Sequence, residues 1–169
     1  DGKTVAQDYA QSAKWFARAA ELGSQDAQYR IGLQYLEGKG ITKDSNMAAQ
    51  WLNKAAELGH ARAQYDLGLM YLVGNGMPQD YSLAAKWFTQ SAIQGDFEAQ
   101  NNLASLYASG RGVEKNYVLA YAWFNVAAVK SNNPTAKSNR EIAAKKLTPA
   151  EITQAQLLSN KWKVGQPMK

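Results

Sequence analysis

Apolar side chains recur at helical spacing in the middle of the chain. Ala63, Leu67 and Tyr71 lie four residues apart and predict one buried face of a helix over about 61–73. A second helix is predicted over about 81–93, and its buried face comprises Tyr81, Ala84, Ala85, Phe88 and Ala92. A glycine soon after this helix leaves only a short turn, so consecutive helices are expected to be antiparallel.

This helical hairpin recurs along the chain at a fixed step of 36 residues. The step relates Trp15, Trp51, Trp87 and Trp123; Gly23, Gly59 and Gly95; Ala27, Ala63 and Ala99; and Tyr35, Tyr71 and Tyr107. A period of this size, held by several positions at once, indicates an array of one supersecondary unit. We therefore predict a repeat array over 1–131, with a partial unit and three complete units at residues 1–23, 24–59, 60–95 and 96–131.

The turn between the two helices of a unit carries recurring residues of its own. Gly-x-Gly pairs at 38/40, 74/76 and 110/112 supply the left-handed backbone that ends the first helix. The apolar residues that follow are expected to cover the core: Ile41, Met77 and Val113. Short polar residues are expected to cap the second helix: Asp8, Asp44, Asp80 and Asn116. Small residues on the first helices predict close approach of a neighbouring helix: Gly32, Gly68 and Ala104.

The two ends of the chain differ from the complete units. Residues 1–23 correspond to the second half of a unit, and a first helix is expected to precede them in the native protein. At the other end, Pro134 and a capping box that begins at Thr148 predict two further helices, over about 134–146 and 149–162. We expect this pair, within residues 132–169, to cap the last apolar face of the array.

The recurring string is A-x-x-x-L-G-x-x-Y-x-x-G-x-G-φ-x-x-D-x-x-x-A-A-x-W-φ-x-x-A-A-x-x-G, where φ is apolar. Residues 63–95 follow it almost position by position, and it resembles the Sel1-like repeat, a relative of the tetratricopeptide repeat. The resemblance covers about residues 2–131, and the segment 146–162 is similar to tails that close many bacterial members. An ordinary tetratricopeptide repeat has a 34-residue step and lacks the Gly-x-Gly loop. The departures from the string are Ala104, Asn116 and Ser131.

The resemblance implies an all-α solenoid. Stacked antiparallel helix pairs would form a right-handed superhelix, with the first helices of the units on its concave surface. It also implies a non-catalytic scaffold that binds a protein or peptide, often in bacterial envelope, secretion or host-interaction settings. The sequence leaves the compartment unknown, and a periplasmic or secreted bacterial location is favoured over a cytoplasmic one.

Composition and charge narrow the classes of function. The chain has no cysteine, which excludes disulfides and thiolate sites, and no apolar run reaches the roughly 18 residues of a membrane helix. The net charge of +5 arises near the C-terminus, where residues 131–169 carry seven basic and two acidic side chains. Solvated faces of the terminal helices explain this density of basic side chains better than a nucleic-acid site does. Binding to an anionic surface through the basic terminal helices stays open as an alternative.

Candidate catalytic chemistry is sparse. His60 is the single histidine, so no histidine pair or Ser-His-Asp set is available, and we expect it to be an exposed turn residue. The Gly-x-Gly loops lack the further glycine and the lysine of phosphate-binding motifs. The four recurring tryptophans are expected to pack in the core or between repeats, while Trp162 anchors the terminal helices. We therefore expect no catalytic residue, no metal site and no cofactor.

A surface for a partner is the remaining candidate site. On each first helix a second stripe lies beside the buried one, at spacings that put its members on one helical face. The stripe varies between copies while the glycine, alanine and tryptophan frame stays fixed, which suits a groove that binds an irregular partner and also suits neutral drift. The candidate partner-binding residues are Asp26, Tyr29, Leu33, Glu37, Arg62, Tyr65, Leu69, Val73, Glu98, Asn101, Ser105 and Ser109.

Within this stripe, Tyr29, Leu33, Tyr65 and Leu69 are predicted to form an amphipathic patch that binds an extended or helical peptide. The alternative is that the leucines pack between adjacent repeats. A cell-envelope polymer-binding or hydrolase-associated protein is the other class of function left open. The incomplete first unit also allows self-association at the N-terminal end.

Overall fold

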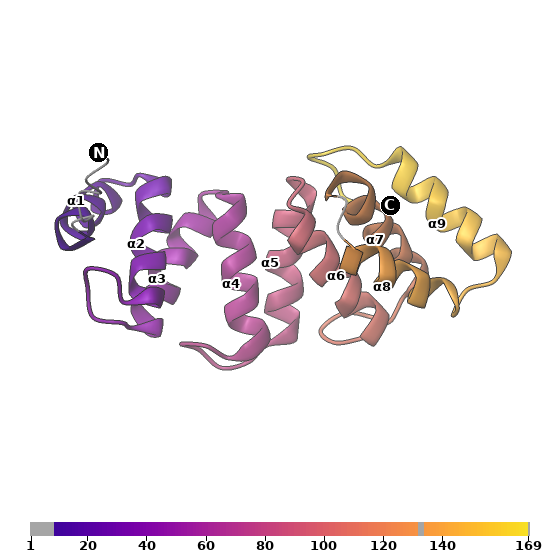
Figure 1. The fold of residues 1–169 in the computed structure, drawn as a ribbon, viewed down its shortest axis with the longest axis horizontal. Coiled ribbons are helices and arrows are strands. Elements are labelled where there is room, and N and C mark those ends of the chain that lie inside the picture. The colour runs from indigo at the N-terminus through magenta and orange to yellow at the C-terminus, as the bar shows by residue number, and fades with distance from the viewer. Residues whose placement is uncertain (1–8, 132–133, 169) are drawn as a thin grey trace, which may run out of the picture.

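The computed structural model describes residues 9–131 and 134–168, and all regular structure in these residues is helical (Figure 1). The helices are α1 Tyr9–Glu21, α2 Gln25–Glu37, α3 Ser45–Glu57, α4 Ala61–Val73, α5 Tyr81–Ile93, α6 Phe97–Ser109, α7 Tyr117–Ser131, α8 Pro134–Ala144 and α9 Pro149–Lys161. They follow one another along the long axis of the molecule, from α1 at one end to α9 at the other (Figure 1). The predicted all-α fold is confirmed.

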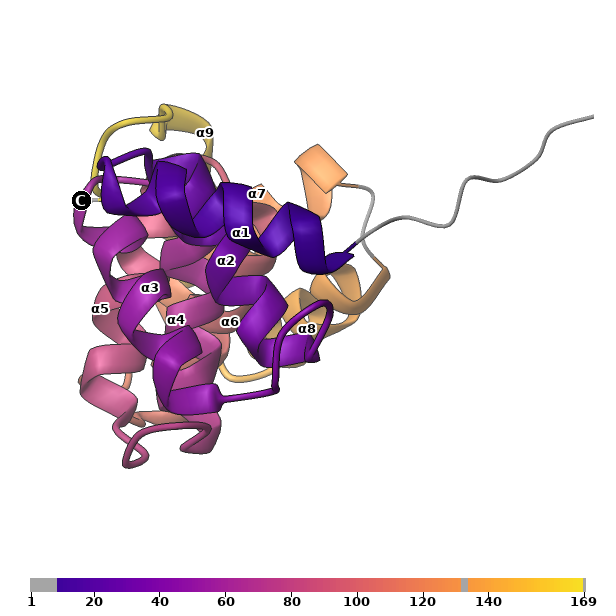
Figure 2. The same cartoon turned by 90° about the vertical axis from the view of Figure 1, so that its left-hand side faces the viewer.

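Each helix from α1 to α7 packs against the next one along the chain, and α9 packs against α7. The first helices of the complete units are α2, α4 and α6, and the second helices are α3, α5 and α7. Viewed along the stack, α3 and α5 lie toward one side and α6 and α8 toward the other, with α4 between them (Figure 2). Three clusters of buried side chains succeed one another along the stack, as expected when each unit covers only its neighbours.

The recurring tryptophans are buried to very different degrees. Trp123 is 3% exposed and Trp87 is 8% exposed, whereas Trp15 is 61% exposed. Trp87 belongs to the buried cluster of α3 and α4, and Trp51 packs against the cluster of α1 and α2, so each indole belongs to a cluster that its own unit shares with the unit before it. The prediction that all four are packed is wrong for Trp15, because no described helix precedes α1.

The two glycines of each Gly-x-Gly pair have separate structural roles. Gly74 has a φ of +76° and caps the C-terminal end of α4, as predicted. Gly76 lies against the preceding unit, where an added Cβ would come within 2.3 Å of the Ser45 carbonyl oxygen. Equivalent contacts pair Gly40 with Tyr9, and Gly112 with Tyr81. The second glycine is therefore the joint between a turn and the helix of the preceding unit.

Close helix packing within a unit also depends on glycine. An added Cβ at Gly68 would lie 2.7 Å from the Phe88 ring, and one at Gly32 would lie 2.9 Å from the Leu52 side chain. The predicted close approach at these two positions is therefore confirmed. The third unit has Ala104 at the same place, and this alanine is fully buried.

Short polar side chains cap the second helices as predicted. Asp44 Oδ1 accepts hydrogen bonds from the backbone amides of Asn46 and Met47, at 2.9 and 3.0 Å. Asp80 does the same at the start of α5, and Asn116 Oδ1 accepts from Leu119 N at the start of α7. Asp8, the remaining predicted cap, lies outside the described residues. The apolar turn residues pack against the core clusters, also as predicted: Ile41, Met77 and Val113.

The C-terminal helices continue the stack. α8 begins 37 residues after α6 and ends at Ala144, two residues before its predicted end. At the start of α9, Thr148 N donates to Glu151 Oε2 at 2.7 Å and Glu151 N donates to Thr148 Oγ1 at 3.3 Å, which confirms the capping box. The Trp162 ring meets Trp123 edge-on at 5.4 Å, so it anchors the end of α9 on α7.

Candidate functional site

The predicted partner-binding residues lie on α2, α4 and α6, and none of them is fully buried. Each helix contributes four of them, from its first turn to its last. The stripe is therefore accessible along three consecutive units. Its chemistry changes from unit to unit: the equivalent first-turn positions hold Asp26, Arg62 and Glu98.

Tyr29, Tyr65 and Leu69 of the stripe also take part in the packing of the array. The Tyr65 ring lies 5.9 Å from the Phe88 ring, and Tyr65 and Leu69 both pack against the buried cluster of α5 to α9. Tyr29 packs in the same way against the cluster of α3 and α4. All of them keep part of their surface exposed. Packing and accessibility thus coexist at these positions.

His60 differs from its predicted role as an exposed turn residue. It is the N-cap of α4, where its Nδ1 accepts a hydrogen bond from Ala63 N at 3.1 Å. An accepting Nδ1 carries no proton, so the proton is on Nε2, which lies 3.4 Å from Asp26 Oδ1. The imidazole also stacks on Tyr29 with the ring centroids 4.4 Å apart. Its side chain is only 17% exposed.

Arg62 makes the corresponding link between the next two units. Its guanidinium forms ion pairs with Asp96, at 3.5 Å, and with Glu98. It also lies over the Tyr65 ring, with Cζ 4.5 Å from the centroid. In both links a first-turn residue of one unit contacts the helix cap of the next unit. These contacts hold the charged part of the stripe in a fixed arrangement.

Asp66 is the half-buried acid of this surface. Burial raises its pKa, even though Arg62 and the Tyr29 hydroxyl favour the ionised carboxylate. Burial, together with the hydrogen bond from Tyr29 to Asp66, raises the pKa of Tyr29 to about 12. The tyrosine hydroxyl is therefore a hydrogen-bond donor, and not a base, throughout the physiological range.

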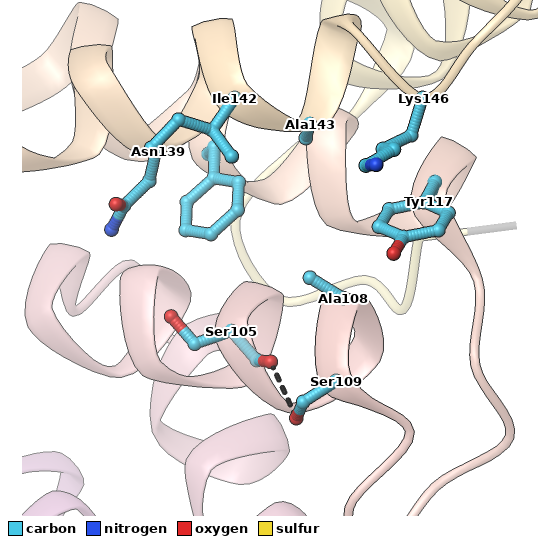
Figure 3. A pocket seen from close by; sticks show the side chains of 9 residues that line it. Ser105, Ala108, Ser109, Tyr117, Asn139, Ile142, Ala143 and Lys146 are labelled. Carbon is cyan, nitrogen blue, oxygen red and sulfur yellow. Dashed lines mark hydrogen bonds between the residues drawn. The ribbon is translucent and has the colours of Figure 1, made fainter.

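The C-terminal end of the stripe is different in character. Ser105 Oγ donates to the Asn101 carbonyl at 2.9 Å, and Ser109 Oγ donates to the Ser105 carbonyl at 2.9 Å. Asn101 Oδ1 accepts a hydrogen bond from Asn139 Nδ2 at 3.2 Å, which links α6 to α8. Beside these residues lies a pocket of about 310 Å³, formed by α6, α7 and α8 (Figure 3).

No group of three or more histidine, aspartate or glutamate side chains able to hold a metal ion occurs in the part of the chain that the structure describes. Within the same residues, every helix is too short or too polar to cross a bilayer. Asp44 and Asp80 cap separate helices, and their carboxylates accept hydrogen bonds from backbone amides.

The sequence matches the family model of the Sel1 repeat over residues 1–24, 25–60, 61–96 and 97–128. The chain belongs to the Sel1 repeat family. The predicted resemblance is thereby confirmed, together with the solenoid of repeated helix pairs. No curated protein matches the sequence significantly.

Solved structures of other Sel1-type proteins share this fold. A Sel1 repeat protein from Oxalobacter formigenes is 35% identical with a TM-score of 0.71, and the match covers 78% of this chain and 98% of that one. Cysteine rich protein B from Helicobacter pylori is 25% identical with a TM-score of 0.60, over 82% of this chain and 98% of that one.

A third structure is a protective antigen present in uropathogenic Escherichia coli strains, which displays an SLR fold. It is 31% identical with a TM-score of 0.68, and the match covers 90% of this chain. This Sel1 chain spans only 40% of the length of that antigen. Sel1 repeat proteins are generally protein-interaction modules and typically non-catalytic scaffolds.

Two recurring features of these Sel1 units were missed by the sequence reasoning. Buried glutamines donate from Nε2 to a carbonyl of the preceding helix, at 3.0 to 3.2 Å: Gln28 to Ala20, Gln64 to Ala56 and Gln100 to Ala92. The first helices have caps of their own: Ser24, His60 and Asp96. Both sets keep the 36-residue step, so the periodicity contained the signal that could have revealed them.

Proposed function

We propose that this protein is a non-catalytic interaction module that binds a protein or peptide partner along the face formed by α2, α4 and α6, on the concave side of the array. The observation that carries the proposal is a constant frame with a variable, accessible stripe. The glycine joints, caps and buried glutamines recur from unit to unit, whereas the first-turn positions hold an acid, a base and an acid: Asp26, Arg62 and Glu98.

The stripe offers the contacts that protein interfaces use. Partly exposed tyrosines provide large apolar surface with a polar tip, and Arg62 is held in place over one of them. Because this scaffold is already ordered by packing, a partner would lose little affinity to ordering of the tyrosines. The antigenic E. coli relative supports an envelope or secreted setting for the partner.

The test is to capture a partner with the wild-type chain, identify it, and measure its dissociation constant against variants. Tyr29→Ala combined with Tyr65→Ala should weaken binding at least tenfold, as expected when aromatic anchors are removed from an interface. Gln50→Ala combined with Gln90→Ala is the matched control, because both glutamines are exposed on α3 and α5.

Circular dichroism and thermal unfolding should show that both double variants are folded. Unchanged affinity in a folded tyrosine variant would exclude this face as the binding surface. Loss of affinity in the glutamine control instead would move the interface to the second helices.

A further inference from the structure

The third repeat differs in sequence from the second on the side of its first helix, α6, that faces α8. Leu69 and Leu72 of α4 pack against the buried cluster of the following helices. The positions one step of 36 residues later are Ser105 and Ala108, and Ser109 replaces Val73 in the same way. Three large apolar side chains are thus exchanged for small ones at the contact with α8. The volume removed coincides with the pocket between α6, α7 and α8.

This space, which we call the α6–α8 pocket, has an apolar floor and one cationic side chain. Phe124 and Ala143 line it and are 3% and 2% exposed, and Ile142 forms an exposed wall. Ser105 and Ser109 donate their hydroxyl protons to carbonyls of their own helix, so they add little demand for a polar ligand. The cavity volume of about 310 Å³ is at the lower limit of ligand pockets and suits one large side chain.

The cation at the mouth of the pocket is Lys146. Its side chain extends from the end of α8 toward Tyr117, which also lines the pocket (Figure 3). None of the ion pairs between described residues involves Lys146. A second lysine, Lys115, lies over the Tyr117 ring with Nζ 5.1 Å from the centroid. Glu98, the acidic residue of α6, is already paired with Arg62.

The two ends of the predicted face therefore differ in charge. Helices α2 and α4 carry three acidic and two basic side chains (Asp26, Glu37 and Asp66 against Arg30 and Arg62), whereas residues 134–146 carry four basic and one acidic (Lys137, Arg140, Lys145 and Lys146 against Glu141). An acidic segment is attracted more strongly to the α8 end than to the other, which favours one position along the face. Charge complementarity thus selects one class of occupant for the pocket.

We infer that the α6–α8 pocket is the anchor site for an acidic peptide segment of the partner. One apolar side chain, of leucine or phenylalanine size, fills the space that the small residues leave, and a neighbouring carboxylate of the segment pairs with Lys146. The inference rests on the proposed function and adds the location and the chemistry of the strongest contact.

The test uses two variants of the chain and one control variant. Ser105→Leu combined with Ala108→Leu restores the residues of the second unit and fills the pocket with side chains that this scaffold already accepts at the equivalent positions. Lys146→Ala removes the cation, and Lys145→Ala is its control, because Lys145 is exposed and does not line the pocket.

The probe is a short fluorescent peptide with glutamates around a single phenylalanine, compared with a version that has serine for phenylalanine and one that has lysines for glutamates. Fluorescence anisotropy should show binding of the first peptide only. Filling the pocket should weaken it about tenfold or more, because burial of one aromatic side chain is lost. Lys146→Ala should weaken it about twofold to fivefold and reduce its salt dependence, and Lys145→Ala should not.

Equal affinity for the filled variant, equal effects of the two lysine substitutions, or no binding of the acidic phenylalanine peptide would each overturn the inference. Measuring the affinity of the captured partner distinguishes a failure of the anchor pocket from a failure of the proposed function. If Tyr29→Ala with Tyr65→Ala weakens that partner while the filled variant binds it normally, the interaction face stands and the anchor pocket does not.

Discussion

Replacing Gly76 by alanine tests the joint between units most directly. Gly76 has a φ of +74°, and a Cβ at this residue would lie 2.3 Å from the oxygen and 2.5 Å from the carbon of the Ser45 carbonyl. Gly59 is the matched control, since it has a φ of +92° but no atom within 4 Å of an added Cβ. Comparing the two variants separates the free-energy cost of a left-handed backbone from the free-energy cost of the contact with Ser45.

The expected magnitudes follow from these two environments. A left-handed conformation costs a non-glycine residue about 1–2 kcal/mol, and the stiffer unfolded chain returns about 0.4–1 kcal/mol, so Gly59→Ala should lose about 1 kcal/mol. At Gly76 the main chain of Ser45 must in addition move by about 1 Å to reach an ordinary contact, and such overpacking costs about 1–3 kcal/mol. Gly76→Ala should therefore lose about 2–4 kcal/mol in total.

Urea unfolding and thermal unfolding, both followed by far-ultraviolet circular dichroism, measure the stability of both variants. For a chain of this size each kcal/mol lowers the melting temperature by about 2–4 °C. Gly76→Ala should also give a shallower transition, because weaker coupling between units lets them unfold separately. If Gly76→Ala is no less stable than Gly59→Ala, the turn can shift at little cost in free energy and the second glycine is not a rigid joint.

Three further sets of substitutions test other parts of the structure. His60→Ala should lose about 1 kcal/mol of unfolding free energy, whereas His60→Ser, which copies the cap at Ser24, should stay within about 0.5 kcal/mol; equal losses would exclude the capping role. Burial raises the pKa of Asp66 in the folded state, so the wild type loses stability as pH rises from the unfolded pKa through the folded one. Asp66→Asn should therefore be more stable than the wild type at neutral pH, with the gain fading in acid, and a gain independent of pH in urea titrations would contradict this. Trp123→Ala should lose about 3–5 kcal/mol and Trp15→Ala less than about 1 kcal/mol, as measured by thermal unfolding, and similar losses would mean that the exposure of Trp15 is wrong.

The fold was predictable because its determinants are repeated. A single helix pattern is ambiguous, but Trp87, Gly95 and Tyr107 each have partners one step away, and every additional copy confirms the alignment. The helix caps were predictable for the same reason, since Asp44 and Asp80 stand directly before an apolar periodic segment. The exposure of Trp15 was not predictable, because it depends on the presence of a neighbouring unit and not on the indole itself.

The candidate site was predictable only in outline. Spacing alone placed Tyr29 and Tyr65 on an accessible face of their helices, and the structure places them there. Spacing alone did not reveal the stacking of His60 on Tyr29, because that contact joins residues of two units and depends on how the helices cross. The α6–α8 pocket was also missed, although the exchange of Leu69 for Ser105 was visible in the aligned copies.

The glycine joints have a consequence for how such a molecule can change its length. Each joint is a contact between main-chain atoms of a turn and the first residue of an earlier helix, at Gly40, Gly76 and Gly112 alike. Since the same geometry recurs at every junction, a duplicated segment of one full period can be spliced into the chain without a new junction having to be invented. Selection can then lengthen the rod by duplication and afterwards alter its outer residues independently.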